Sequence, residues 1–176
     1  VVLPRAPDRH IVGWSWFPIS RHGVDRGGFE DDLARSRDRL AALLERLPRE
    51  RHGIGRPVLT GFSQGGMLSF AVAVTRPDLV VRVVPVAGWL PASLRPQLLP
   101  AGSRAPIRAL HGVDDPLLLV APTRLLVSQL VRTGFDASLR EYAGVGHSIT
   151  PSMRRDLFSE LARGIEAARA EAKAAR

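Results

Sequence analysis

Gly61-Phe62-Ser63-Gln64-Gly65 fits the pattern G-x-S-x-G, in which a serine lies on a sharp turn between a strand and a helix. Such a turn exposes the Ser63 hydroxyl and points the N-terminus of the helix at it, so that the backbone N–H of Gln64 can stabilise an oxyanion. We expect Gly61 and Gly65 to be required because a Cβ at either position would collide as the two elements fold back. The pattern therefore predicts Ser63 as a nucleophile; the alternative is a glycine-rich turn with a capping serine.

A serine hydroxyl is a poor nucleophile unless a base accepts its proton, and histidine is the usual base. His147 follows the last expected strand and precedes the last expected helix, which puts it on the same rim of a sheet as Ser63. His111 directly follows another strand and is the rival candidate. The other histidines, His10, His22 and His52, lie in arginine-rich stretches and are expected to be exposed.

A carboxylate is needed to orient the histidine, and two neighbours, Asp114 and Asp115, follow a predicted strand. Both cannot point at His147, so one of them is expected to be solvated or to cap the loop. With either aspartate, the chain order is serine, aspartate, histidine, which is the order of the α/β-hydrolases.

Short apolar runs alternate with segments of helical periodicity along the chain, which predicts parallel strands joined by crossover helices. The expected strands are 1–3, 57–60, 81–87, 107–110 and 137–142, and the expected helices are 29–47, 64–75, 122–134 and one that opens at Thr150-Pro151. The prediction is an α/β fold with a mostly parallel sheet and helices on both faces. The Ala-rich stretch 166–176 is expected to be a frayed, solvated helix end.

The composition favours a single globular domain over residues 1–176, with 45 % hydrophobic and 24 % charged residues. The chain contains no cysteine, which excludes disulfides and a thiolate metal site. The net charge of +8 comes from arginines that are spread along the chain and mixed with acids, so we expect no nucleic-acid partner. No apolar run reaches the ~18 residues of a membrane span, and no signal peptide is evident, so the default expectation is the cytoplasm.

Three motifs in this order resemble those of the carboxylesterase/phospholipase family of α/β-hydrolases, which includes the acyl-protein thioesterases. They are the Gly-Phe-Ser-Gln-Gly-Gly turn, the segment His111-Gly112-Val113-Asp114-Asp115-Pro116 and the closing Gly146-His147-Ser148. Upstream, Pro4-Arg5-Ala6-Pro7 and Gly13-Trp14-Ser15-Trp16-Phe17 are similar to further family segments, so the resemblance covers most of residues 1–165. In the family the acid immediately precedes the proline, which implies Asp115 rather than Asp114.

The family also carries a strand that ends in His-Gly-x-Gly well upstream of the serine, and its loop donates one oxyanion N–H. Neither His22-Gly23 nor His52-Gly53 follows a strand, so neither replaces this motif. The length of the family implies that about fifty N-terminal residues of its pattern are missing. Only the N–H of Gln64 is then left as an oxyanion donor, and removal of one such donor typically costs ~10²–10³ in kcat.

The resemblance implies hydrolysis of small-molecule carboxylic esters or thioesters by Ser63, His147 and Asp115, with no metal and no organic cofactor. Trp14, Trp16, Phe17 and Leu117 are the candidate lining of an acyl pocket, with packing in the core as the alternative. Two other interpretations stay open: a truncated, inactive hydrolase fold that acts by binding, and a related enzyme for polyesters or acetylated sugar esters. The oligomeric state is not predicted.

Overall fold

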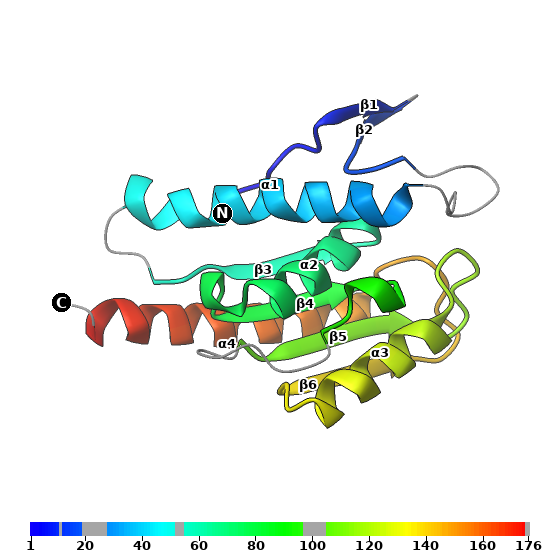
Figure 1. Cartoon of the computed structure of the whole chain (residues 1–176). Coiled ribbons are helices and arrows are strands. Elements are labelled where there is room, and N and C mark those ends of the chain that lie inside the picture. The colour runs from blue at the N-terminus through cyan, green and yellow to red at the C-terminus, as the bar shows by residue number, and fades with distance from the viewer. Residues whose placement is uncertain (11, 19–27, 52–54, 97–104, 175–176) are drawn as a thin grey trace.

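A computed structural model of the chain describes residues 1–10, 12–18, 28–51, 55–96 and 105–174. Within these ranges the central element is a parallel sheet with the strand order β3-β4-β5-β6 (Figure 1). Its strands are β3 (Val58–Phe62), β4 (Arg82–Val86), β5 (Ile107–Gly112) and β6 (Ala137–Tyr142). Because all neighbouring strands are parallel, their carboxyl ends share one edge of the sheet, as predicted.

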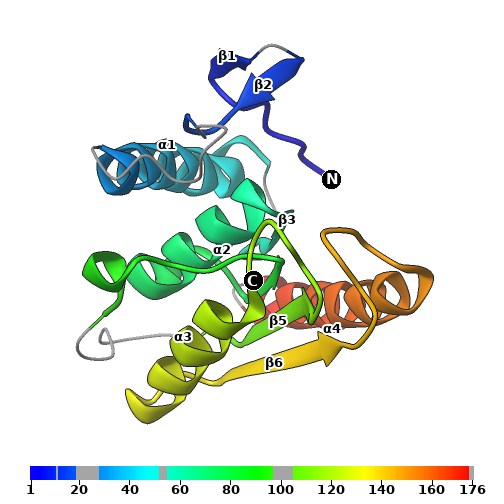
Figure 2. The same ribbon diagram turned by 90° about the vertical axis from the view of Figure 1, so that its right-hand side faces the viewer.

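Helices cover both faces of this sheet (Figure 2). Helices α2 (Gln64–Thr75) and α3 (Val120–Arg132) lie on one face, and α4 (Pro151–Ala174) lies on the other. Helix α1 (Phe29–Glu50) packs against α2, and two short 3₁₀ helices are formed by Pro77–Leu79 and Ala92–Leu94. The predicted fold class is therefore confirmed.

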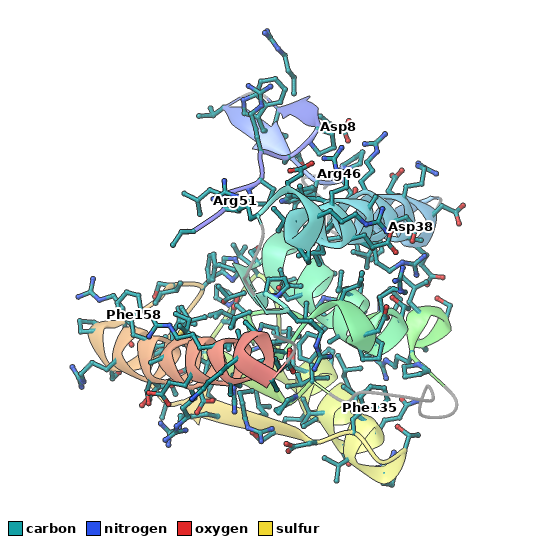
Figure 3. All side chains as sticks on the ribbon, turned by 90° about the vertical axis from the view of Figure 1, so that its left-hand side faces the viewer. Asp8, Asp38, Arg46, Arg51, Phe135 and Phe158 are labelled. Carbon is teal, nitrogen blue, oxygen red and sulfur yellow. The ribbon has the colours of Figure 1, made fainter. Side chains whose placement is uncertain are left out.

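The helix positions follow from local signals in the sequence. Helix α2 is apolar on all sides because it lies between the sheet and α1, and its residues from Gly66 to Val74 are all buried. Helix α1 instead buries one stripe and directs charged side chains such as Asp38 and Arg46 outwards (Figure 3). The N–H of Met153 donates a hydrogen bond to the Thr150 hydroxyl at 3.3 Å, so Thr150 caps α4 as expected.

The N-terminal region differs from the prediction. Residues 1–3, expected to be a strand, have no regular structure, whereas β1 (Asp8–His10) and β2 (Gly13–Ser15) form an antiparallel hairpin that was not predicted. Each of its strands has only three residues, too few for an alternating pattern to be recognised. Gly13, the first residue of β2, has φ +98°, a conformation that favours glycine.

The C-terminal stretch expected to be a solvated helix end is helical as far as Ala174. It lies beside the residues that lead into β3: the Arg56 guanidinium donates to the Glu171 carboxylate, with 3.0 Å between Nε and Oε2. The Gly55 backbone approaches so closely that a Cβ there would lie 2.1 Å from the carbonyl oxygen of Ala168. None of the helices among the described residues has the length and apolar character needed to span a membrane.

Candidate active site

Ser63 lies between β3 and α2 in a strained backbone conformation. Its φ of 58° and ψ of −115° are unusual for a residue with a side chain, and its N–H donates to the carbonyl of Val86 at 3.0 Å. Although Ser63 precedes the first residue of α2, its hydroxyl makes no capping hydrogen bond to that helix. The hydroxyl is therefore free for another partner, which disfavours the interpretation of Ser63 as a capping serine.

Two glycines allow the sharp turn, but they are not the two that we expected. A Cβ at Gly61 would lie 2.4 Å from the carbonyl carbon of Gly65, so Gly61 is required as predicted. A Cβ at Gly65 would meet nothing within 4 Å, so the prediction for Gly65 is wrong. Gly66 is the second required glycine, because its Cβ would lie 2.4 Å from the carbonyl oxygen of Val86.

The structure brings His147 to Ser63 from the loop between β6 and α4. The His147 Nε2 lies 3.0 Å from the Ser63 Oγ. The imidazole lies beside the Phe62 ring, with 4.6 Å between ring centroids, and only 15 % of the His147 side chain is exposed. The loops after β3 and β6 thus meet across two intervening strands, because the carboxyl ends of all four strands lie on the same side.

Asp115 occupies the far side of the His147 ring, with its Oδ2 2.7 Å from the His147 Nδ1. Its Oδ1 accepts hydrogen bonds from the N–H groups of Leu117 and Leu118, each at 2.9 Å. Burial disfavours the charged carboxylate, but the hydrogen bonds from Leu118, His147 and Leu117 outweigh it and hold the pKa of Asp115 below its ordinary value. Asp114 instead accepts a hydrogen bond from the Gly144 N–H at 2.7 Å and stays in the loop.

Gln64 contributes to the site through its backbone and its side chain. Its N–H lies in the first turn of α2, where helical N–H groups have no partner within the helix. Its side-chain amide donates to the Phe17 carbonyl at 2.8 Å and accepts from the Trp16 N–H at 3.0 Å. This second role was missed, because nothing in the local sequence links position 64 to residues almost fifty positions earlier.

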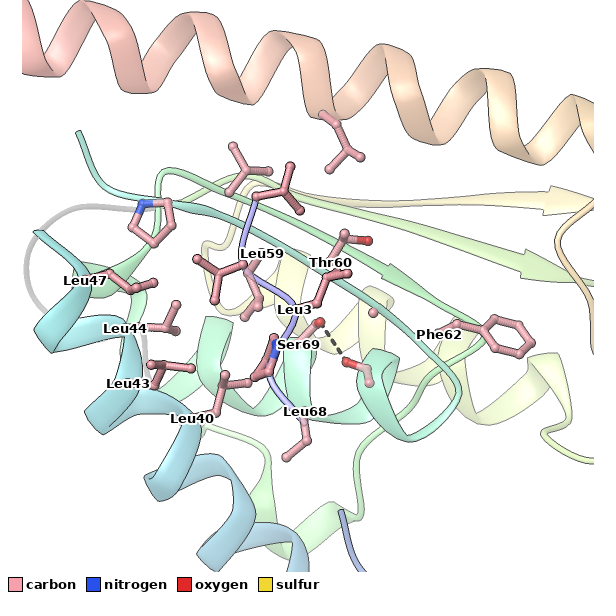
Figure 4. Close-up of a pocket in the computed structure, with 18 of the residues that line it drawn as sticks. Leu3, Leu40, Leu43, Leu44, Leu47, Leu59, Thr60, Phe62, Leu68 and Ser69 are labelled. Carbon is pink, nitrogen blue, oxygen red and sulfur yellow. Dashed lines mark hydrogen bonds between the residues drawn. The ribbon is translucent and has the colours of Figure 1, made fainter. Parts of the chain in front are cut away.

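A cavity of about 1770 Å³ extends from Ser63 along β3 (Figure 4). It follows the free edge of the sheet, because β4 is the only described strand that pairs with β3. The walls combine the N-terminal residues Val1–Pro4 and charged side chains such as Arg56 and Lys173 with apolar side chains of α1, α2, β3 and α4. These apolar side chains include Leu40, Leu43, Leu44, Leu47, Leu59, Leu68, Leu161 and Ile165. Its volume exceeds the ~300–1,000 Å³ typical of small-ligand pockets, so it combines a cleft at Ser63 with an open sheet edge.

Of the four candidate pocket residues, two line the cavity and two do not. Trp14 and Trp16 line the cavity, and the Trp14 ring is covered by the guanidinium of Arg5, whose Cζ lies 4.2 Å from the ring centroid. Phe17 is fully buried and packs edge-on against Phe29 in the core, as the alternative interpretation held. Leu117 is 71 % exposed and is not part of the cavity wall.

Neither of the other two histidines within the described ranges, His10 and His111, forms a hydrogen bond with Ser63. His111, the rival candidate, is fully buried beneath the turn that carries Asp115. His10 is exposed in β1 and lines the cavity that contains Ser63. His22 and His52 lie outside the described residues. Among the described residues, no group of His, Asp or Glu side chains is arranged to hold a metal ion.

Residues 3–163 match the phospholipase/carboxylesterase family of α/β-hydrolases. The chain belongs to this family. The resemblance inferred from the three motifs is therefore confirmed, and it extends over nearly the whole range expected.

Family members with similar sequences include carboxylesterases and thioesterases. A probable carboxylesterase from Oryza sativa subsp. japonica is 26% identical over 167 residues, which cover 89% of this chain and 62% of the rice protein. Acyl-protein thioesterase 1 from Gibberella zeae is 29% identical over 169 residues, which cover 85% of this chain and 70% of the relative. The crystal structure of esterase PE8 superimposes with a TM-score of 0.78 at 25% identity, covering 92% of this chain and 76% of that one. This chain thus spans somewhat more than three fifths of the rice relative.

Proposed function

We propose that this chain hydrolyses carboxylic esters or thioesters through an acyl-serine intermediate. The observation that carries the proposal is the continuous series of hydrogen bonds from Ser63 Oγ to His147 Nε2, at 3.0 Å, and from His147 Nδ1 to Asp115 Oδ2, at 2.7 Å. Nδ1 carries a proton and donates a hydrogen bond to the carboxylate, so Nε2 is free to accept the serine proton. The esterases and thioesterases among the relatives support the same reaction class.

In the first half-reaction, Ser63 Oγ attacks the carbonyl carbon while its proton passes to His147 Nε2. The negative oxygen that forms is stabilised by the Gln64 N–H at the start of α2. The C–O or C–S bond then breaks, and His147 returns the proton to the leaving alkoxide or thiolate. Asp115 stabilises the imidazolium and holds the Nδ1–H tautomer throughout.

In the second half-reaction, water attacks the acyl-serine carbonyl and gives its proton to His147. The serine oxygen leaves and recovers that proton, which releases the carboxylic acid and restores the free enzyme. The scheme uses only side chains and backbone groups of this chain, and it includes no metal or organic cofactor.

The proposal can be tested with a fluorophosphonate probe, which reacts with an activated serine without assuming a substrate. We expect the wild-type chain to be labelled, and Ser63→Ala and His147→Ala to abolish labelling. Ser128→Ala, an exposed serine on α3, is the matched control and should be labelled like the wild type. Absence of labelling in a chain that is folded by circular dichroism would contradict the proposal.

One observation favours a second candidate, a hydrolase fold that binds acyl compounds without turnover. The Gln64 N–H is the one oxyanion donor identified among the described residues, and the cavity beside it is open along β3. A panel of aryl esters, acyl thioesters, polyester fragments and acetylated sugars, each at several chain lengths, separates binding from turnover and ranks the substrate classes. Saturable binding without release of product would favour this candidate.

A further inference from the structure

Beneath the Asp115 turn lies a polar network that the proposed mechanism does not use. His111, at the end of β5, is fully buried, and its Nε2 lies 2.7 Å from the Leu118 carbonyl oxygen. On the opposite side of the ring, Nδ1 lies 3.1 Å from the Thr123 hydroxyl. The same hydroxyl lies 2.8 Å from the Gly88 carbonyl oxygen, so the ring is held from two sides.

The protonation of His111 follows from its partners. A contact of 2.7 Å between Nε2 and a carbonyl oxygen requires a proton on Nε2. Burial lowers the pKa of His111 more than its hydrogen bond to Leu118 and the charges of Asp115 and Glu141 raise it, and His147 lowers it further. The ring is therefore neutral, Nε2–H donates to Leu118, and Nδ1 accepts the Thr123 hydroxyl proton, which it shares with Gly88.

Leu118 links His111 to the candidate acid. The Leu118 carbonyl accepts from His111, while the Leu118 N–H donates to Asp115 Oδ1 at 2.9 Å. The other carboxylate oxygen, Oδ2, points at His147 and lies 3.6 Å from His111 Nε2, beyond hydrogen-bond distance. A shift of Leu118 would rotate the Asp115 carboxylate and lengthen its bond to His147.

The network also returns to the serine turn. A Cβ at Gly88 would lie 2.4 Å from the carbonyl carbon of Gly66, so the residue whose carbonyl faces Thr123 is pressed against the first turn of α2. The contacts thus run from α2 through Gly88, Thr123, His111 and Leu118 to Asp115. On the solvent side, the contacts of His147 with Asp115 and with Ser63 complete this closed series.

We infer that His111, held by Thr123, is a positioning residue that fixes the Leu118 carbonyl and thereby aims the Asp115 carboxylate at His147. The inference rests on the proposed function for its kinetic consequence, whereas the geometry it predicts can be measured without turnover. His111 itself touches none of the reacting atoms. Its effect passes through Leu118.

The test compares His111→Leu, which removes both ring nitrogens, with His111→Gln, whose amide N–H can still reach the Leu118 carbonyl. We expect His111→Leu to lower kcat for an aryl ester by about 10- to 100-fold with little change in KM, because the acid loses its alignment. His111→Gln should recover most of the activity. Thr123→Val should give a smaller loss, and Thr123→Ser should restore it.

A double-mutant cycle with Asp115→Ala separates positioning from general damage. Once Asp115 is absent, His111→Leu should lower kcat by less than about threefold, because the group that it positions is gone. An equal loss in both backgrounds would overturn the inference, as would full activity of His111→Leu.

Proton NMR gives a reading that does not depend on turnover. The Nδ1–H of His147 in a 2.7 Å bond to a carboxylate should give a strongly deshielded resonance. We expect His111→Leu to weaken or shift this resonance and His111→Gln to restore it, with Asp115→Asn as the reference for its loss. If the wild-type chain shows the resonance and this pattern but no hydrolysis, the proposed function fails while the positioning role stands. An unchanged resonance in folded His111→Leu would overturn the role.

Discussion

The two sides of Ser63 are built in different ways. On the side of β5 and β6, buried polar groups hold each other in place: Asp115, for example, accepts from His147 and from two backbone N–H groups. On the side of β3, many of the residues that line the cavity are apolar, and no second described strand pairs with β3 at the sheet edge. Polar contacts define direction, whereas apolar surfaces define mainly shape. We therefore expect the groups proposed to transfer protons to be held in accurate alignment, and the cavity side to accept a range of substrate shapes.

The largest expected effect comes from a substitution of Asp115, on the side of β5 and β6. Asp115→Asn should lower kcat by about 10⁴-fold, because an amide no longer holds the required tautomer of His147. Asp114→Asn, which alters the neighbouring loop bond to Gly144, should change kcat by less than about threefold. Steady-state hydrolysis of an aryl ester measures both. Equal losses in the two variants would contradict the assignment.

A second pair of variants tests the turn that separates the two sides. Gly61→Ala should destabilise the chain by about 1–3 kcal/mol or more, because its Cβ would overlap the Gly65 backbone. Gly65→Ala meets open space and should be neutral or stabilise by up to about 1 kcal/mol through reduced unfolded-state entropy. Urea unfolding followed by circular dichroism compares them; the reverse order would refute the packing described for this turn.

On the side of β3, the side-chain amide of Gln64 forms hydrogen bonds that connect the serine turn to residues 15–17. Gln64→Ala removes its hydrogen bonds to Trp16 and Phe17 and should lower the free energy of unfolding by about 1–3 kcal/mol. The backbone N–H stays, so fluorophosphonate labelling of Ser63 should persist. Gln129→Ala, on α3, is the control and should stay within about 0.5 kcal/mol of the wild type. No loss of stability in Gln64→Ala would mean that these bonds contribute nothing.

The stability of the chain should also depend on pH through His111, on the side of β5 and β6. Burial lowers the pKa of His111, so below its ordinary value of 6.5 the unfolded chain binds a proton that the native ring does not. Stability therefore falls as the pH drops from about 6.5 towards the lowered pKa. Urea unfolding at several pH values should show a weaker acid dependence in His111→Gln. Identical slopes in both proteins would argue against a neutral buried ring.

The smallest expected effect is spectroscopic. Tyr142 is the only tyrosine of the chain, and burial together with its hydrogen bond to Asp156 raises its pKa to about 12. Protonated Tyr142 thus stabilises the native state, and this contribution is lost as the pH rises from about 10 through the raised pKa. Tyrosinate absorbance should appear late in a base titration and earlier in Asp156→Asn. A titration midpoint near 10 in both the wild type and Asp156→Asn would show that the Tyr142 hydroxyl is not hydrogen-bonded to Asp156.

The sequence predicted those parts of the molecule that depend on local patterns. The four strands of the sheet and its helices follow from apolar runs and end signals such as Thr150-Pro151, and the residues brought together at the site follow from motifs at strand ends. The β1–β2 hairpin, the Gln64 contacts and the Thr123–His111–Leu118 network were missed. The hairpin strands are too short for a period, and the Gln64 contacts span almost fifty positions. The contacts of His111 depend on how the loop after β5 folds, so no local signal reports them. Gly65 was misjudged because which backbone a Cβ meets depends on the packing of α2 on β4.

The edge of β3 that no described strand covers also bears on how this chain behaves at high concentration. An unpaired strand edge beside apolar side chains is a template for a strand of another molecule. What opposes such pairing is the mutual repulsion of copies that each carry a net charge of +8. Added salt screens this repulsion and leaves the apolar attraction intact. We therefore expect purification at low ionic strength to keep copies of this chain apart.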